Sequence, residues 1–279
     1  MEPHEAGRIG QLGKRAAPAL AAAANAGPVR GATRLLAMYL DILQGKGSGT
    51  GWDMGGEVTA AVAFLAGARD PVIFDVGANV GEWTREIWAA LGRGRYFAYE
   101  PQQACADRLK ASDVPGLTIV QRAVSDQPGE LDLHADFAGS VVASLYQRAD
   151  TYLDPQTCVE RVQVTTVDEE MQAYGLDRID FMKIDVEGAE LQVLQGAQRA
   201  LGRQAIRSFT FEFGSANIYS RVFFRDLWDL IAGNGYSLWR IVPGGRLIPQ
   251  PRYREDLEHF RGVSNYVASV VQPQLRHGK

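Results

Sequence analysis

The stretch VIFDVGANVG, residues 72–81, decides the fold of this 279-residue chain. Its apolar run ends in Asp75, and glycines follow at positions 77 and 81 with Asn79 between them. A short apolar strand that enters a glycine-containing turn and then a helix is typical of the first unit of an open α/β sheet. Ligands of such sheets bind beyond the carboxyl ends of the strands, so this turn is the first place to expect a site.

The turn does not carry the motifs of the common phosphate-binding loops. Its two glycines are four residues apart, which does not match GxGxxG, and no GxxxxGK[ST] sequence is present. The glycines allow a ligand to approach the backbone closely, and an asparagine tolerates the left-handed conformation better than most residues. Asp75 at the strand end favours a ligand with positive charge or hydrogen-bond donors. A sulfonium amino acid such as S-adenosylmethionine (SAM) offers both.

A second acid stands at the expected end of the next strand. Glu100 lies 19 residues beyond Gly81 and is followed by Pro101. An acid at this place accepts hydrogen bonds from both hydroxyls of a ribose. A glycine turn alone, or a strand-end acid alone, is often only structural. The two together, within one strand–helix–strand unit, predict a nucleoside site.

The rest of the chain alternates between strand-like and helix-like segments. This alternation predicts a mostly parallel sheet with helices on both faces. The expected strands are 71–76, 95–100, 117–124, 129–136 (antiparallel), 161–167, 179–186, 206–213, 236–242 and 264–271. The expected helices are 32–43, 57–67, 81–91, 102–112, 168–175, 189–201 and 223–235.

Composition and charge exclude several classes of function. The net charge of −4 argues against a nucleic-acid partner, which needs a basic face. The two cysteines form no CxxC pair and the four histidines form no HExxH or HxH motif, so no disulfide framework or histidine-rich metal centre is expected. No run of 18 apolar residues occurs, and the N-terminus makes a poor secretory signal. We therefore expect no membrane span and a cytoplasmic location.

A second unusual stretch is FMKIDVEGAELQVLQGA, residues 181–197. Lys183, Asp185 and Glu187 interrupt an apolar strand at its carboxyl end, which opens into the same crevice as the first turn. Burying this much charge is costly unless the groups are paired or used. One interpretation is structural, because carboxylates at a helix start gain from the helix dipole and Lys183 can pair with one of them. The other is a catalytic constellation.

Taken together, FDVGANVG, YEP, TTVDEE and KIDVEGAELQVLQGA resemble the FkbM family of SAM-dependent methyltransferases, from about residue 70 to about residue 215. KIDVEGAE is the most specific of these motifs. The resemblance implies an α/β class I methyltransferase (Rossmann-like) fold, with a seven-stranded, mostly parallel sheet, helices on both faces and here an N-terminal helical extension. It also implies an O-methyltransferase that converts SAM to S-adenosylhomocysteine (SAH) and methylates a hydroxyl of a sugar, a polyketide or another natural product.

The resemblance also assigns residues to the cofactor and to the acceptor. The cofactor residues that it implies are Asp75, Gly77, Ala78, Asn79, Gly81, Glu100, Pro101, Arg122, Ala123 and Asp185. Asp185 is the first choice for the catalytic base and Glu187 the second, with His134 as a rival. The expected acceptor contacts are Lys183, Glu212, Asn217 and Tyr219. Mg²⁺ is a further candidate cofactor, because Asp185, Glu187 and Glu212 supply the oxygen ligands that it prefers.

The chain is expected to have two parts. Residues 1–56 form a helical arm with a Gly-rich connector, and residues 57–279 form the SAM-dependent methyltransferase domain. The arm is interpreted as a lid, as a homodimer contact or as a decoration packed on the sheet. Three other functions stay open: an N-methyltransferase for a small amine, a non-catalytic SAM-binding module and an NAD-dependent dehydrogenase. The missing GxGxxG disfavours the last, and the absence of DPPY or NPPY disfavours methylation of nucleic-acid amines.

Overall fold

The computed structural model describes residues 16–49, 54–149 and 155–274. The chain divides into two compact units, Met1–Gln44 and Gly45–Lys279. The predicted connector, 45–56, lies partly outside the described residues, because residues 50–53 do not belong to them. The functional division predicted at residue 57 stays a prediction.

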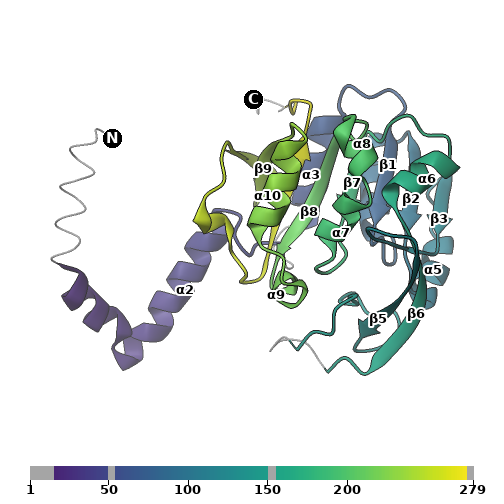
Figure 1. The fold of residues 1–279 in the computed structure, drawn as a ribbon. Coiled ribbons are helices and arrows are strands. Elements are labelled where there is room, and N and C mark those ends of the chain that lie inside the picture. Colours follow the sequence, from purple (N-terminus) through teal and green to yellow (C-terminus); the bar gives the residue numbers. More distant parts are fainter. Residues whose placement is uncertain (1–15, 50–53, 150–154, 275–279) are drawn as a thin grey trace. The chain divides into compact units, whose positions relative to one another are not determined.

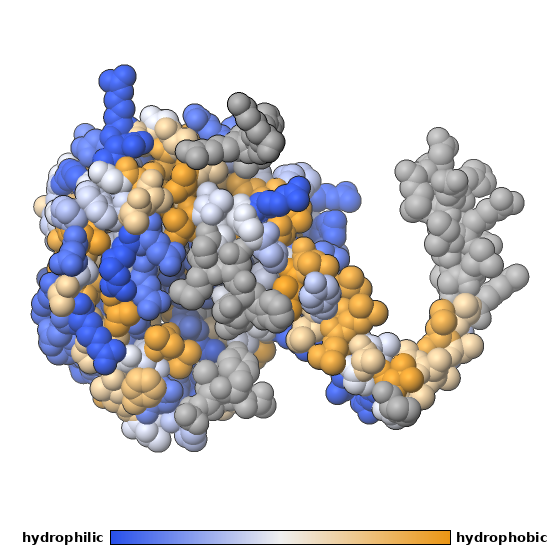
Figure 2. Space-filling view, turned by 180° about the vertical axis from the view of Figure 1, so that it is seen from behind, coloured by the Kyte–Doolittle hydropathy of each residue, from blue (hydrophilic) through white to orange (hydrophobic). Residues whose placement is uncertain are grey.

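The first unit contains the helix α2, Gly27–Leu43, which includes the helix expected at 32–43. Large apolar side chains recur along it at helical spacing and are exposed, and Figure 2 shows apolar side chains gathered along this arm. They are Leu35, Leu36, Tyr39, Leu40 and Leu43. The structure confirms the predicted helix.

The second unit is built on an eight-stranded sheet with the order β10-β9-β11-β8-β7-β1-β2-β3 (Figure 1). The strands are β1 Val72–Val76, β2 Arg95–Tyr99, β3 Leu117–Val120, β7 Phe181–Ile184, β8 Ser208–Gly214, β9 Ser237–Val242, β10 Arg246–Gln250 and β11 Val263–Ser269. The five neighbouring strands β8, β7, β1, β2 and β3 pair in parallel. Strand β11 runs antiparallel to both β8 and β9. The predicted mostly parallel sheet is therefore confirmed.

The sheet has one strand more than the seven expected. The additional strand is β10, which returns antiparallel onto β9 after a turn through Gly244 and Gly245. Its sequence, RLIPQ, contains a proline and was not expected to form a strand. Proline lacks the N–H that a central strand needs, but an edge strand tolerates it, and β10 lies at the edge.

A second, three-stranded sheet has the order β4-β6-β5, with β4 Ala123–Val124, β5 Gly129–Ala135 and β6 Cys158–Thr165. The prediction of one strand over 117–124 was wrong, because the chain leaves the main sheet after Val120. A tight turn, in which the N–H of Arg122 donates to the carbonyl of Val120, redirects it into β4. The antiparallel strand expected at 129–136 is confirmed as β5, which pairs with β6.

Helices cover both faces of the main sheet (Figure 1). On one face lie α3 Met54–Leu65, α4 Glu82–Leu91 and α5 Gln103–Lys110. On the other lie α6 Val167–Ala173, α7 Glu190–Gln195, α8 Gln198–Gly202 and α10 Phe224–Gly233. Neighbouring residues of β1 face opposite cores: Ile73 packs with Trp83 and Ile87 of α4, and Phe74 belongs to the larger core. This alternation is the pattern of a strand buried on both sides.

Two helical predictions needed correction. The helix expected at 189–201 is divided into α7 and α8, because the Asp168 carboxylate accepts hydrogen bonds from the N–H groups of Arg199 and Ala200, both at 2.9 Å, and so starts a new helix. No helix was expected between residues 213 and 223, but the short helix α9, Ala216–Ser220, forms there. Within the described residues, no helix is both long and apolar enough to span a membrane.

Candidate active site

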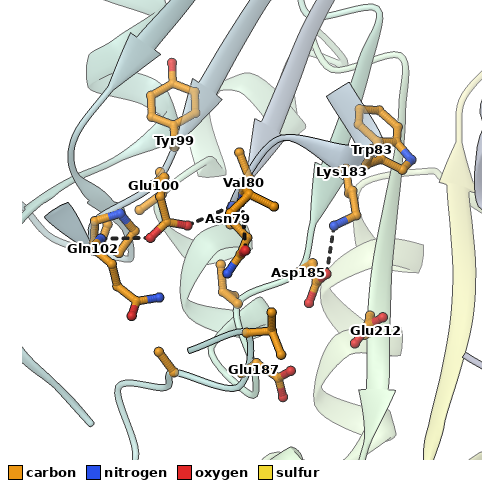
Figure 3. Close-up of a pocket in the computed structure, with 18 of the residues that line it drawn as sticks. Asn79, Val80, Trp83, Tyr99, Glu100, Gln102, Lys183, Asp185, Glu187 and Glu212 are labelled. Atoms are coloured by element: carbon orange, nitrogen blue, oxygen red, sulfur yellow. Dashed lines mark hydrogen bonds and ion pairs between the residues drawn. The ribbon is translucent and has the colours of Figure 1, made fainter. Parts of the chain in front are cut away.

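A cavity of about 280 Å³ opens beyond the carboxyl ends of the central strands, and Figure 3 shows part of its lining. Most of the predicted site residues line it, although they come from distant parts of the chain. They are Gly77, Ala78, Asn79, Glu100, Pro101, Arg122, Ala123, Lys183, Asp185, Glu187 and Glu212. The structure therefore brings both motifs to one place.

The first turn needs the residues that the sequence provides. Gly77 has φ 82°, and a Cβ atom there would lie 1.8 Å from the carbonyl oxygen of Asp185. Only glycine lets this turn approach the β7 turn so closely. Asn79 has φ 48°, so the predicted left-handed conformation is confirmed. Its backbone N–H donates to Oε2 of Glu100 at 2.8 Å.

The carboxylate of Glu100 is buried and held on both sides (Figure 3). Oε2 accepts from the Asn79 N–H, and Oε1 accepts from the Gln102 N–H at 2.8 Å. Burial raises the pKa of Glu100 to about 7, although these two backbone N–H groups act in the opposite direction. Each oxygen retains one further lone pair, which can accept a hydrogen bond from a ligand hydroxyl.

Two predicted cofactor residues, Asp75 and Gly81, do not line the cavity. Asp75 is 2% exposed and accepts a hydrogen bond from the Thr84 hydroxyl, so it ties α4 to β1. Burial raises its pKa, and the positive charge of Lys183 acts in the opposite direction. Gly81, with φ 78°, starts α4, and a Cβ atom there would lie 2.4 Å from a methyl group of Leu109. Both residues therefore stabilise the turn without lining the cavity.

Lys183 and Asp185 form a close ion pair at the end of β7. Nζ of Lys183 lies 2.7 Å from Oδ2 of Asp185, and the lysine side chain is 8% exposed (Figure 3). Burial lowers the pKa of Lys183, but the negative charges of Asp185, Asp75 and Glu57 outweigh burial and raise it above its ordinary value. The ammonium group therefore stays charged among these carboxylates.

Glu187 lies in a strained turn that a distant loop supports. Its φ of 52° is left-handed, which is unusual for a residue with a side chain. Arg148 forms an ion pair with its carboxylate, and the Ser144 hydroxyl donates to its backbone carbonyl at 2.7 Å. Burial and the charge of Asp185 raise the pKa of Glu187 to about 7, and Arg148 acts against this rise.

The remaining lining carries further polar side chains that the sequence motifs do not include. Glu57 comes from α3, Trp83 from α4 and Asn265 from β11. Trp83 and Asn265 are 8% and 7% exposed, and neither Nε1 of Trp83 nor Oδ1 of Asn265 has a hydrogen-bond partner among the described residues. Buried polar atoms are normally paired, so these two atoms are available to a ligand.

Two predicted acceptor contacts and the rival base lie outside the cavity lining. Asn217 is buried, and its side chain accepts from the N–H of Gly214 at 2.8 Å and donates to Glu190 at 3.4 Å, so it stabilises the backbone. Tyr219 is half-buried in α9. His134 lies within β5, where its backbone pairs with Ser144. The positions of Asn217, Tyr219 and His134 give their predicted roles no support.

Asp185, Glu187 and Glu212 share one side of the cavity (Figure 3). Across residues 16–49, 54–149 and 155–274, however, no three His, Cys, Asp or Glu side chains are arranged as a metal-binding group. The Mg²⁺ set stays a prediction without geometric support.

Sequence reasoning missed several residues that shape the site. The Gln102 side chain accepts from Gly139 N–H at 3.0 Å and donates to the carbonyl of Ser140 at 2.9 Å, which brings the 139–148 loop against the cavity. Arg148 belongs to the same loop. One signal was available for Glu57, because it is the single acid in the apolar helix α3. Gln102 stands at the start of the helix expected at 102–112, where its side-chain contacts leave no sequence signal, and Arg148 lies in a segment for which no element was expected.

The model of the methyltransferase FkbM domain matches residues 75–238, which is more than half of the chain. The chain belongs to the FkbM methyltransferase family. The matched range contains the first turn, Glu100 and the Lys183–Glu187 constellation, so the resemblance seen in the sequence is confirmed. Glu57 and Asn265 lie outside it.

Two curated relatives of this FkbM-family protein are methyltransferases by name. The 2-O-methyltransferase NoeI of Sinorhizobium fredii is 26% identical over 180 residues, which cover 58% of this chain and 71% of NoeI. The methyltransferase sdnD of Sordaria araneosa is 28% identical over 156 residues, which cover 46% of this chain and 60% of sdnD. Among solved structures, an O-methyltransferase from Bacillus cereus in complex with SAH matches 78% of this chain and 80% of its own, with 11% identity and a TM-score of 0.40.

Proposed function

We propose that the protein transfers a methyl group from SAM to a hydroxyl group of a small molecule, such as a sugar, a polyketide or another natural product. One observation carries this proposal. A single cavity joins the Gly77–Asn79 turn and Glu100 to the charged residues Lys183, Asp185 and Glu187, in a chain of the FkbM family. The name of NoeI, a 2-O-methyltransferase, supports oxygen as the acceptor atom.

The residues present fit SAM. The lining is rich in acids and poor in cations, which favours a ligand with a sulfonium and an ammonium group. Its carboxylates are Glu57, Glu82, Glu86, Glu100, Asp185, Glu187 and Glu212, and its cations are Arg122 and Lys183. In this proposal Glu100 accepts hydrogen bonds from the ribose hydroxyls, and Arg122 and Ala123 flank the adenine. The Gly77–Asn79 backbone lies along the methionine part.

When bound, SAM supplies the methyl group: the S–CH₃ bond breaks as an O–CH₃ bond forms, and SAH is left. The protein has to orient the acceptor oxygen in line with this bond and to accept the hydroxyl proton. Asp185 and Glu187 are the residues that we propose for these two tasks.

The environment of the two carboxylates distinguishes their roles. Asp185 is engaged by the Lys183 ammonium at 2.7 Å, which suits a group that orients the acceptor. Glu187 has a pKa of about 7, raised by burial and by Asp185. A base with a pKa near the working pH combines a useful ionised fraction with sufficient basicity. We therefore propose Glu187 as the proton acceptor and Asp185 as the positioning carboxylate, which reverses the order expected from the sequence.

The test is SAM-dependent formation of SAH in the presence of a panel of hydroxyl-bearing sugars and polyketides, with mass spectrometry of the product. An acceptor that gains a methyl group on oxygen supports the proposal, and one that gains it only on nitrogen overturns the choice of oxygen. Glu187→Gln is expected to lower turnover by about 10²–10⁴-fold while SAH binding changes little. Chelation followed by addition of Mg²⁺ tests the metal prediction.

The proposed setting of the reaction is the cytoplasm, with a small molecule rather than a nucleic acid as the acceptor and with homodimer contacts through the arm. Sedimentation of the full chain beside a variant that lacks the arm tests the last point. Loss of a dimer in the shortened variant supports it, and a monomeric full chain contradicts it.

A further inference from the structure

One end of the cavity is formed by three side chains that the proposed chemistry does not use. Glu57 comes from α3, Glu212 from β8 and Asn265 from β11, and Glu57 is near enough to Glu212 for its charge to act on that carboxyl group. Glu212 and Asn265 are direct partners across the antiparallel β8–β11 pair, so their side chains stand next to each other on one face of the sheet. Figure 3 shows Glu212 beside Asp185 and apart from Glu100. This end of the cavity therefore lies away from the proposed ribose site.

Within the described residues, the carboxylate oxygens of Glu57 and Glu212 and the amide oxygen of Asn265 have no hydrogen-bond donor. Asn265 is 7% exposed, and its Oδ1 atom is buried. Because buried acceptors without donors are costly, this group is built to receive donors from a ligand.

The charge of the region indicates which donor fits. Glu57, Asp185 and Glu212 carry three carboxylates, and the nearby cation, Lys183, is already paired with Asp185. A cationic donor offsets this excess of negative charge, which a neutral hydroxyl does not.

We propose that Glu57, Glu212 and Asn265 form a binding subsite for a primary ammonium group. An ammonium group has three N–H donors and no acceptor, which matches two carboxylates and one amide oxygen. The inference rests on the proposed function, because two reactants of that reaction can supply such a group. One is the methionine end of SAM, and the other is an acceptor that carries an amino group besides its reacting hydroxyl.

The first arm of the test is calorimetric titration of the full chain with two nucleosides. SAH carries the ammonium group, and 5′-methylthioadenosine lacks the whole amino-acid end. If SAM fills the subsite, Glu57→Gln and Glu212→Gln each weaken SAH binding by about tenfold or more, and methylthioadenosine binding stays unchanged. Glu255→Gln, the same change at an exposed position, is the control and leaves both affinities as they are.

The second arm uses glucosamine and glucose as probes on the SAH-saturated protein, followed by NMR. If the acceptor fills the subsite, the two Glu→Gln variants bind SAH like the wild type but lose about tenfold in affinity for glucosamine, with no change for glucose. Melting temperatures of the variants, expected at or above that of the wild type because like charges are removed, show that they fold.

The proposal is overturned if both variants keep wild-type affinity for SAH and also for glucosamine. A wild-type chain that binds neither SAH nor methylthioadenosine overturns the proposed function instead. In that case the glucosamine arm, carried out without SAH, still decides whether the subsite exists.

Discussion

Nζ of Lys183 lies 2.7 Å from Oδ2 of Asp185, two residues further along the chain, at the carboxyl end of β7. Residues i and i+2 of an extended segment face the same side, so the sequence KID places both charges in the cavity. The lysine is the cation that offsets three neighbouring acids, Asp185, Asp75 and Glu57.

Replacing Lys183 by methionine is therefore expected to destabilise the protein by about 3 kcal/mol near neutral pH, because buried carboxylates lose their counter-charge. The pKa values of Asp75 and Glu57, which Lys183 lowers, then rise further. Acids whose folded pKa is raised cost stability as pH rises from their unfolded toward their folded pKa. The loss should thus be larger at about pH 8 than at about pH 5 in urea denaturation.

Lys110→Met is the matched control for this substitution. Lys110 pairs with Asp107 at a similar distance, 2.8 Å, but both side chains are more than half exposed. Exposed pairs contribute about 1 kcal/mol at most. An equal loss in the two variants would contradict the role given to Lys183.

Arg148 sets the proton affinity of Glu187. Because burial raises the pKa of Glu187 to about 7 and Arg148 acts against the rise, Arg148→Gln is expected to move it to higher pH. The measurement is ¹³C NMR titration of the Glu187 carboxyl group, which needs no acceptor. A wild-type midpoint near the ordinary value of a glutamate, or no shift in the variant, would be evidence against this account.

Gly77→Ala is expected to abolish SAH binding and to destabilise the fold. The added Cβ would lie 1.8 Å from the carbonyl oxygen of Asp185, at a φ of 82°. Gly92→Ala is the control, since Gly92 also has a left-handed φ, 63°, but has open space around it. It should cost only about 1 kcal/mol in denaturant unfolding, and SAH should still bind. Equal effects of the two substitutions would mean that backbone strain, and not the close approach of the two turns, explains the need for glycine at position 77.

The parts of the fold that the sequence predicted are those with local signals. The first turn shows this, because its glycines and Asn79 are required by their own backbone conformations. The division of 189–201 into two helices was missed because it depends on Asp168, which is distant in sequence. Strand β10 was missed because only its place at the sheet edge makes a proline acceptable.

In the site, too, the residues with a local sequence signal were predicted and those that depend on distant contacts were not. Glu100 and Asp185 stand at strand ends, where the order of the elements alone predicts a crevice. Arg148 reaches Glu187 across 39 positions, and Asn265 reaches the cavity only through the pairing of β11 with β8. Such contacts depend on sheet order and loop path, which have no local pattern. For the same reason, the sequence did not show that Asn217 supports the backbone instead of facing the acceptor.

Glu100→Gln tests the ribose contact. Loss of the negative acceptor is expected to weaken SAH binding by about tenfold, since a hydrogen bond to a charged group contributes about 1.5–3 kcal/mol. The 2′,3′-dideoxy analogue of SAH has no ribose hydroxyls and should bind the wild type and the variant alike. If Glu100→Gln weakens binding of the analogue as much as it weakens binding of SAH, Glu100 acts only by holding the Asn79 turn.

The central claim is that the cavity binds SAM and its product. Calorimetric titration of the full chain with SAH, and separately with the dinucleotide NAD, tests it most directly. The account predicts that SAH binds, that NAD does not, and that Glu100→Gln weakens SAH binding. Binding of NAD without binding of SAH would contradict it.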